Sequence, residues 1–355
     1  MHARILKGPG HWAGVGAAWA ALLGPAGPRS HEQRAEWAQA LARQWQNEES
    51  RWFLAEDDSG PVAALPYQLT VRRIGPVRVR VLTNEWGTDG LAAPRLTPED
   101  LRRVLLDTSA HAGEPIDVLS LNRLLPGSTF LRLATAAPSG LHTESRHGGC
   151  SVIDTRVAAD EWFAAVGKNL RASLRKARNR FERQGTLTVT VATTPDEVAD
   201  AFEEYVTIEA SGWKGDKGAL ANRPADRRML REFLVATAGV GDGFVRTLRL
   251  DGRPAAAQLG CVTARTLALL KVAYDDALAD LSPSNLLMAD LVRACCDRPD
   301  VDRIDLITNQ PWHRRWHAQV LPTYRARDVD LRRPGGLVAR GAAALEQVGV
   351  RLPRA

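Results

Sequence analysis

Three strand-like segments separated by short turns constrain the fold of this chain more than any other feature. They read GFVRTLRL (243–250), RPAAAQLGCVT (253–263) and RTLALLKVAYD (265–275), and Asp-Gly and Ala-Arg pairs lie at the turns. Turns this short join neighbouring antiparallel strands. We therefore expect an antiparallel meander, followed by an amphipathic helix that starts near Ser284.

Helix and strand patterns alternate on both sides of this meander. Before it, we expect a long helix over residues 159–184, a strand at TLTVTVAT and a helix opened by Thr194-Pro195-Asp196-Glu197, with Pro in the first turn. After it come a strand at RIDLITN, a short Trp-rich helix and a strand at YRARDVDL. The first half repeats the order more weakly, which predicts an internal structural duplication and an α/β (α+β) fold.

Domain boundaries follow from length and local composition. A chain of 355 residues accommodates one large or two medium domains. Residues 136–150 are rich in Gly, Ser and His, so we place a boundary there. The expected domains are 1–150 and 151–330, with a C-terminal tail at 331–355.

Charge and composition indicate a globular protein and leave open whether it binds an anion. Hydrophobic residues make up 45% and charged residues 25%, and the net charge is +6. This excess suits a phosphorylated cofactor or RNA, but a coding bias towards Arg and Ala explains it equally well. The four cysteines lack metal-ligand spacing, and the N-terminal apolar stretch is too short to span a bilayer. We expect a cytoplasmic protein without membrane insertion or a bound metal.

The helix expected at 159–184 carries an apolar stripe and an unusually basic opposite face. The stripe repeats at three- and four-residue steps from Phe163 to Phe181. Like charges four residues apart repel each other. The basic face is either balanced by acids of neighbouring elements or binds phosphates or RNA. Its cations are Lys168, Arg171, Arg175, Lys176, Arg178, Arg180 and Arg183.

The stretch YDDALADLSPSNLLMADLVR (274–293) predicts a helix start that follows directly on a strand. Ser282 is the expected N-cap, and Pro283 takes the first helical position. The N–H groups of Ser284, Asn285 and Leu286 would then lack intrahelical partners, which makes such a start an anion site. Lys271 lies on the strand leading in. A plain capped helix is the alternative interpretation.

Two further segments are candidates for pocket walls. The loop ASGWKGDKGAL (210–220) contains Trp213 and Lys214, but its composition is also that of an ordinary loop. In DLITNQPWHRRWH, Trp312 and Trp316 are four residues apart and so are expected on one helix face. His313 and His317 have the same spacing, but no third ligand accompanies them, so we favour Trp–Arg packing over a metal site.

Together these stretches resemble a known family. The basic helix NLRASLRKARNRFERQG, the loop SGWKGDKGAL, the segment LLKVAYDDALADLSPSNLL and IDLITNQPWHRRW lie in order from about residue 160 to 325. They are similar to the GNAT-like acyltransferase domain of CelD/BcsL-type proteins (the BioF-like acetyltransferase family), which is related to the Fem-type transferases. The first half resembles that family's N-terminal repeat more faintly.

This resemblance implies two tandem GNAT-like domains with mixed, mostly antiparallel, twisted sheets flanked by helices. It also implies transfer of an acyl group from acyl-CoA, typically acetyl-CoA, to an amine or hydroxyl of a small-molecule or saccharide acceptor. The donor's pyrophosphate would rest on residues 282–286. The sequence departs from the family where Leu281 and Ser284 replace the Tyr and Gly of its Tyr-Ser-Pro-Gly motif, and the usual GNAT donor signature is absent.

The resulting hypothesis is direct transfer without a covalent intermediate. Asp275 is the first candidate for general base and Asp305 the second, while Tyr274 would protonate the leaving group. A turn cap is the alternative role for Asp275. The residues assigned to the substrate are Trp213, Lys214, Trp312, His313 and Arg175.

Two other functions remain open from the sequence. One is a Fem-type ligase that uses aminoacyl-tRNA, which the basic helix favours, and the other is a non-catalytic binding module in a biosynthetic assembly. The sequence leaves the acceptor, the acyl chain and the oligomeric state open.

Overall fold

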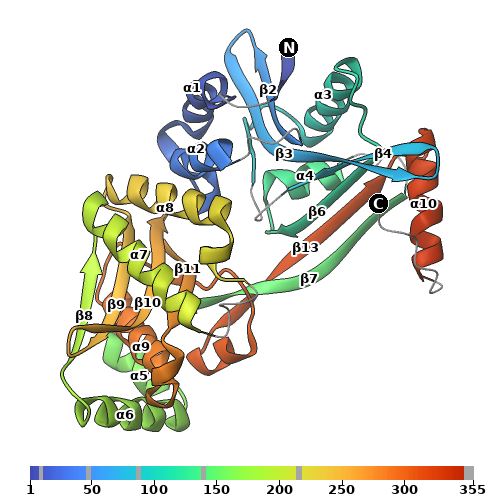
Figure 1. Cartoon of the computed structure of the whole chain (residues 1–355). Coiled ribbons are helices and arrows are strands. Elements are labelled where there is room, and N and C mark those ends of the chain that lie inside the picture. The colour runs from blue at the N-terminus through green and yellow to red at the C-terminus, as the bar shows by residue number, and fades with distance from the viewer. Residues whose placement is uncertain (8–10, 45–48, 85–88, 137–140, 213–217, 348–355) are drawn as a thin grey trace. The chain divides into compact units, whose positions relative to one another are not determined.

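The computed structural model describes residues 1–7, 11–44, 49–84, 89–136, 141–212 and 218–347 (Figure 1). The chain forms two compact units. Unit 1 comprises residues 1–27, 32–149 and 322–355, and unit 2 comprises residues 28–31 and 150–321. The division at residues 150 and 330 drawn from the sequence stays a prediction.

Unit 1 is a mixed sheet with helices packed against it. Its strands follow the order β1-β2-β3-β4-β6-β13, antiparallel except for the parallel pair β4 and β6. The buried side chains of β3 and β6 pack with those of α3 and α4 in one core. The elements are β1 (His2–Lys7), α1 (His11–Leu23), α2 (Ala35–Gln44), β2 (Ser50–Asp57), β3 (Gly60–Ile74), β4 (Val77–Thr83), β5 (Leu91–Ala92), α3 (Pro98–His111), β6 (Val118–Leu124), α4 (Thr129–Thr135), the first part of β7 (Leu141–Asp154), most of β13 (Gln319–Val329) and α10 (Pro334–Gln347).

Unit 2 contains the predicted meander. Its strands follow the order β7-β12-β11-β10-β9-β8, and only β11 and β12 run parallel. The elements are the end of β7, α5 (Ala159–Ala165), α6 (Lys168–Glu182), β8 (Leu187–Ala192), α7 (Pro195–Ser211), α8 (Pro224–Ala238), β9 (Gly243–Leu250), β10 (Arg253–Thr263), β11 (Thr266–Tyr274), the 3₁₀ helix η4 (Asp276–Leu281), α9 (Pro283–Cys296), β12 (Arg303–Asp305) and the 3₁₀ helix η5 (Pro311–Trp316). The predicted fold class, mostly antiparallel sheets flanked by helices, is confirmed.

Both faces of the unit 2 sheet are covered by helices. Helices α7 and α8 pack on β9 and β10, and α9 also packs on these strands (Figure 1). Successive strand residues point to opposite faces of a sheet. On β11, Lys271 bonds to Glu209 of α7, whereas Val272 packs in the core cluster that contains Met288 and Leu291 of α9. Helices α7 and α9 therefore lie on opposite faces.

The prediction of one long helix over residues 159–184 is wrong, because this segment forms two helices, α5 and α6. Val166 and Gly167 have extended backbone between α5 and α6. Glycine is a poor helix former, which explains the break. The apolar stripe itself is confirmed, since Leu170 and Phe181 are buried. The sequence analysis also missed β1, β7, α8 and α10.

Candidate functional site

The parallel strands β11 and β12 begin together and then separate. Thr266, Leu267 and Ala268 pair with Arg303, Ile304 and Asp305, and the ladder between the strands ends there. β12 stops after three residues, while β11 continues for six more, to Tyr274. The chain after β12 turns at Ile307, which has a left-handed backbone with φ of 61°. This divergence creates a gap in the sheet along the second half of β11.

An irregularity in the strand pairing lies at the start of the divergence. On β10, Leu259 pairs with Lys271 and Gly260 pairs with Leu269, so Leu270 is an extra residue in β11. Such a β-bulge bends the strand and increases its twist. Gly260 allows close packing opposite, because a Cβ there would lie 2.5 Å from Cζ of Phe244.

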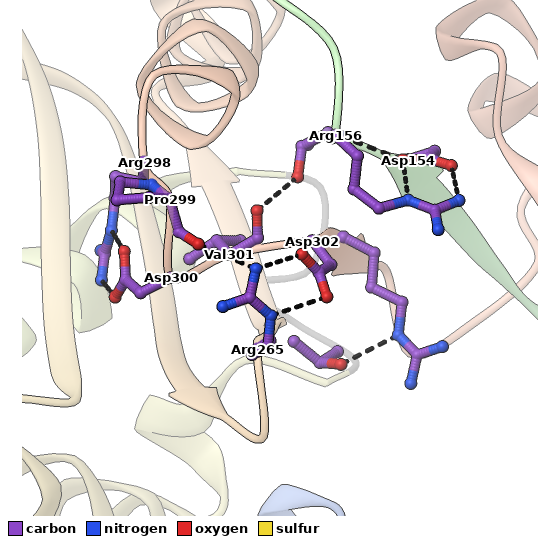
Figure 2. Close-up of polar contacts among 11 residues, drawn as sticks. Asp154, Arg156, Arg265, Arg298, Pro299, Asp300, Val301 and Asp302 are labelled. Carbon is purple, nitrogen blue, oxygen red and sulfur yellow. Dashed lines mark hydrogen bonds and ion pairs between the residues drawn. The ribbon is translucent and has the colours of Figure 1, made fainter.

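An ion pair joins the turn before β11 to the residue before β12, at the paired end of the two strands (Figure 2). In the turn before β11, Arg265 donates to both carboxylate oxygens of Asp302 at 2.6 and 2.8 Å, and to the carbonyl of Pro299 at 2.8 Å. The backbone N–H of Asp302 donates to the carbonyl of Arg265 at 2.8 Å. The Arg265 guanidinium lowers the pKa of Asp302, so this carboxylate is charged at neutral pH.

A pocket of about 650 Å³ occupies the gap. Its wall consists of residues 269–274 of β11, 282–285 at the start of α9, 306–308 after β12, and four residues of the segment 310–315, together with Ala279, Glu209 and Gly212. A concave, mostly apolar cavity with a few polar groups is typical of a small-molecule site.

The start of α9 contributes polar groups to this pocket. Ser282 is the residue before the helix, as predicted, but its backbone is left-handed (φ 57°, ψ 49°) and its side chain makes no capping bond. The carbonyl of Ser282 accepts from the N–H groups of Asn285 at 3.1 Å and Leu286 at 3.3 Å. The prediction of three bare amides is therefore wrong for these two residues. Within the described part of the chain, the N–H of Ser284 makes no such bond.

A buried carboxylate lines the opposite side of the pocket. Glu209, near the end of α7, accepts from Tyr205 Oη at 3.0 Å, from the backbone N–H of Leu220 at 2.7 Å and from Lys271 Nζ at 3.4 Å. Its side chain is 1% exposed, whereas that of Lys271 is 19% exposed. Burial and the neighbouring Glu209 charge raise the pKa of Tyr205, which keeps this phenol neutral. Glu209 is the one carboxylate among the described residues of the wall.

The short helix η5 presents two different sides. The expectation that Trp312 and Trp316 share a face is wrong, because Trp316 is fully buried and Trp312 is 39% exposed. The helix is 3₁₀, with three residues per turn, so residues three apart share a face. His313 and Trp316 form the buried side, and Trp312 and Arg315 both line the pocket.

His313 holds this turn in place. Its Nδ1 accepts the N–H of Gln310 at 3.3 Å, in a capping box that closes the start of η5. Burial lowers the pKa of His313, while a hydrogen bond to the backbone of Thr308 acts in the opposite direction. The ring is therefore a neutral structural group at pH 7. A buried Trp316 stacked on Trp162, with ring centroids 6.4 Å apart, fixes the other end.

The structure brings seven of the predicted site residues to the pocket. They are Lys271, Tyr274, Ser282, Ser284, Asn285, Trp312 and His313. Leu286 is packed in the core, and Arg175 is exposed on α6, so neither lines the pocket. Trp213 and Lys214 lie outside the described residues.

The two predicted bases have other partners. Asp275 caps η4 by accepting the N–H of Ala277 at 3.0 Å, and it pairs with Arg253 at 2.6 Å. Asp305 accepts the N–H of Ile307 at 2.7 Å, at the bend after β12. Neither aspartate is among the residues that line the pocket. The contacts of Asp275 are therefore those of a turn cap, which was its alternative role.

Glu209 and Arg315 are pocket residues that the sequence analysis did not assign. Glu209 lies inside a helical pattern, and no local motif distinguishes it from the other acids of α7. Arg315 shares a face with Trp312 because η5 is a 3₁₀ helix, which the sequence pattern did not indicate.

The basic face of α6 has no carboxylate partners within the described residues. Arg171 donates to the carbonyl of Ala164 at 3.3 Å and Arg180 to that of Asp280 at 2.9 Å. Balance by ion pairs with neighbouring acids is therefore not observed for its seven cations.

The described residues contain no group of three or more His, Cys, Asp or Glu side chains that could hold a metal ion. None of the helices in the ranges described is long and apolar enough to cross a membrane.

Comparison with known proteins finds a family-model match in the second half of the chain. Residues 168–328 match the family model described as "Acetyltransferase (GNAT) domain". No curated protein matches the chain.

Solved structures share the fold of the whole chain at low sequence identity. The C-terminal domain (DUF2156) of a putative lysylphosphatidylglycerol synthetase from Agrobacterium fabrum is 14% identical, with a TM-score of 0.55 and coverage of 97% of this chain and 99% of that one. FemX is 11% identical, with a TM-score of 0.55 and coverage of 93% and 98%. A conserved protein of unknown function from Bacteroides thetaiotaomicron is 12% identical, with a TM-score of 0.53 and coverage of 84% and 90%. These similarities support a GNAT/Fem-like fold, while the CelD/BcsL type named from the sequence stays a prediction.

Proposed function

We propose that this protein is an N- or O-acyltransferase that moves an acyl group from acyl-CoA, with acetyl-CoA as the simplest donor, to an amine or hydroxyl of a small-molecule or saccharide acceptor. The observation that carries the proposal is the pocket between the diverging strands β11 and β12, with the start of α9 in its wall. It lies inside the region that matches the GNAT acetyltransferase domain.

The donor would enter with its acyl group beside the second half of β11. Leu270, the extra residue of the bulge, has no partner in the register with β10. Backbone amides at this point would polarise the thioester carbonyl, as oxyanion donors do. The donor's phosphates would lie at residues 282–285, where the Ser284 N–H and the helix dipole favour negative charge. Leu286 would contribute no direct contact, since its amide donates to Ser282.

Direct attack on the thioester requires a group that takes a proton from the acceptor. Asp275 and Asp305 were the candidates from the sequence, but neither carboxylate lines the pocket. Glu209 is the one carboxylate in the described wall, so we assign it the role of general base, which accepts this proton. Tyr274 also lines the pocket and would protonate the departing thiolate.

Substitution of an exposed pocket residue tests donor binding. Ala279 is exposed and lines the pocket, whereas Ala277, two residues earlier, is exposed but does not line it. Ala279→Trp should fill part of the cavity and weaken acetyl-CoA binding, measured by calorimetry, at least tenfold. Ala277→Trp is the matched control and should leave binding within about twofold. Equal affinity in both variants would contradict the placement of the donor.

Two carboxylate variants test the proton acceptor. Glu209→Gln should reduce turnover of acetyl-CoA at least tenfold, because a positioned general base contributes roughly 10²–10⁴-fold. Asp275→Asn should change turnover only a few-fold. The opposite result would return the role of base to Asp275. Thermal unfolding of each variant, with and without acetyl-CoA, separates loss of chemistry from loss of fold or donor binding.

A second candidate, a transferase that takes its donor from aminoacyl-tRNA, is favoured by the cations of α6, which form no ion pair within the described residues. Neutralised phosphates release counterions, so binding to tRNA would fall steeply with salt. Arg175→Gln with Arg178→Gln should reduce the slope of log K against log salt by roughly 1–2. The control, Arg228→Gln with Arg314→Gln, removes two exposed cations elsewhere. An equal change in both double variants would argue against this candidate.

A further inference from the structure

The charges in the pocket wall do not cancel. Lys271 is paired with Glu209, and His313 is neutral because burial lowers its pKa. Arg315 is exposed and lines the pocket, and within the described ranges it makes no hydrogen bond or ion pair. The described wall thus carries one uncompensated positive charge, which belongs to Arg315.

Arg315 and Trp312 share one face of η5. They are three residues apart in a 3₁₀ helix, where side chains at this spacing eclipse. The buried pair, His313 and Trp316, has the same spacing and forms a different side. Arg314 is exposed and is absent from the pocket wall. An indole and a guanidinium therefore project together from one turn towards the cavity.

Contacts of the backbone and of Trp316 anchor this turn, so Trp312 and Arg315 project from a defined backbone position. The capping box between Gln310 and His313 closes its first turn, and Pro311 restricts the backbone at the first helical position. Trp316, fully buried, stacks on Trp162. A preorganised site loses little conformational entropy when a ligand binds.

We propose that Trp312 and Arg315 form an anion subsite of the pocket, which takes a carboxylate or phosphate group next to a flat or apolar portion of a substrate. A guanidinium binds either group through two parallel hydrogen bonds. An indole face offers a flat apolar surface beside it. The inference rests on the proposed function and extends it, because it gives the substrate an anionic group. That group belongs either to the acceptor or to the donor.

Benzoate and benzamide are suitable probes because they share a ring and differ in charge. Wild-type protein should bind benzoate at least tenfold more tightly than benzamide, measured by NMR titration. Arg315→Gln should remove this preference, and Arg315→Lys should restore part of it. Trp312→Ala should weaken both probes. Arg314→Gln is the matched control and should retain the wild-type preference, since its side chain lies outside the wall.

Competition with acetyl-CoA identifies the source of the anionic group. If benzoate binds alongside saturating acetyl-CoA, the subsite belongs to the acceptor. If acetyl-CoA displaces benzoate and Arg315→Gln weakens acetyl-CoA but not acetyl-pantetheine, the subsite holds the donor's phosphate. Absence of benzoate binding, or equal binding by wild type and Arg315→Gln, would overturn the proposal. Benzoate binding is read without any acyl transfer, so a failure of the proposed function remains distinguishable.

Discussion

Removal of the buried carboxylate of Glu209 should destabilise unit 2 more than removal of any exposed acid on the same helix. In Glu209→Ala the hydroxyl of Tyr205 and the N–H of Leu220 lose their acceptor, at 3.0 and 2.7 Å, and both groups are buried. An unsatisfied buried polar group costs about 1–3 kcal/mol. Lys271 also loses its partner, but it is partly exposed and can be solvated.

The expected total is about 3–5 kcal/mol, the range for breaking a buried ion pair from one side. For a unit of this size each kcal/mol lowers Tm by about 2–4 °C, so Tm should fall by about 6–20 °C. Glu209→Gln retains one acceptor oxygen and should cost less. Urea and thermal unfolding followed by circular dichroism measure these differences.

Glu203 on α7 provides the matched control. Its side chain is 42% exposed and pairs with Arg227 on the surface. Exposed ion pairs contribute about 0–1 kcal/mol, so Glu203→Ala should have a small effect. If Glu209→Ala cost no more than Glu203→Ala, the buried network at the pocket wall would not contribute to stability as its contacts indicate.

Three further predictions concern packing and titration. Gly260→Ala should cost about 1–3 kcal/mol in chemical denaturation, because the new methyl would overlap Phe244, whereas Gly167→Ala, with no atom within 4 Å, should stay near wild type. Trp316→Ala should cost about 3–5 kcal/mol, since its ring is fully buried; a loss below 1 kcal/mol would show that the ring does not hold η5. Burial raises the pKa of Asp89 to about 6, so its contribution to stability is fully present below about pH 4 and is lost as pH rises through 6. Unfolding free energies of Asp89→Asn and wild type should therefore differ in slope between pH 4 and 6, and parallel curves would refute the shift.

The sequence predicted those parts of the fold that local patterns determine. The three-stranded meander and the helix start at Thr194 are present, and Thr194 accepts the expected backbone N–H. The position of the α9 start followed from Ser-Pro, because proline fixes the first helical residue. The elements β7 and α10 were missed, because their sequences lack a strong hydrophobic period.

The parts of the site that depend on distant partners could not be predicted. Asp275 looked available as a base because its sequence neighbours give no sign of Arg253, which approaches from β10. Glu209 looked like any helical acid, since the partner Lys271 is 62 residues away in the chain. The faces of η5 were assigned for 3.6 residues per turn, whereas the 3₁₀ helix has three.

The pocket itself follows from short-range features that act on a parallel strand pair. Arg265 and Asp302 are paired at the point where the two strands start. Asp305 then accepts the N–H of Ile307 and bends the chain away, which ends the ladder after three residues. Asp305, which was a candidate base, therefore has another role in the proposed function. The bend that it stabilises opens the gap in which a donor can lie. Chemistry in that space must be carried by groups of the wall, of which the described chain supplies one carboxylate and one unpaired guanidinium.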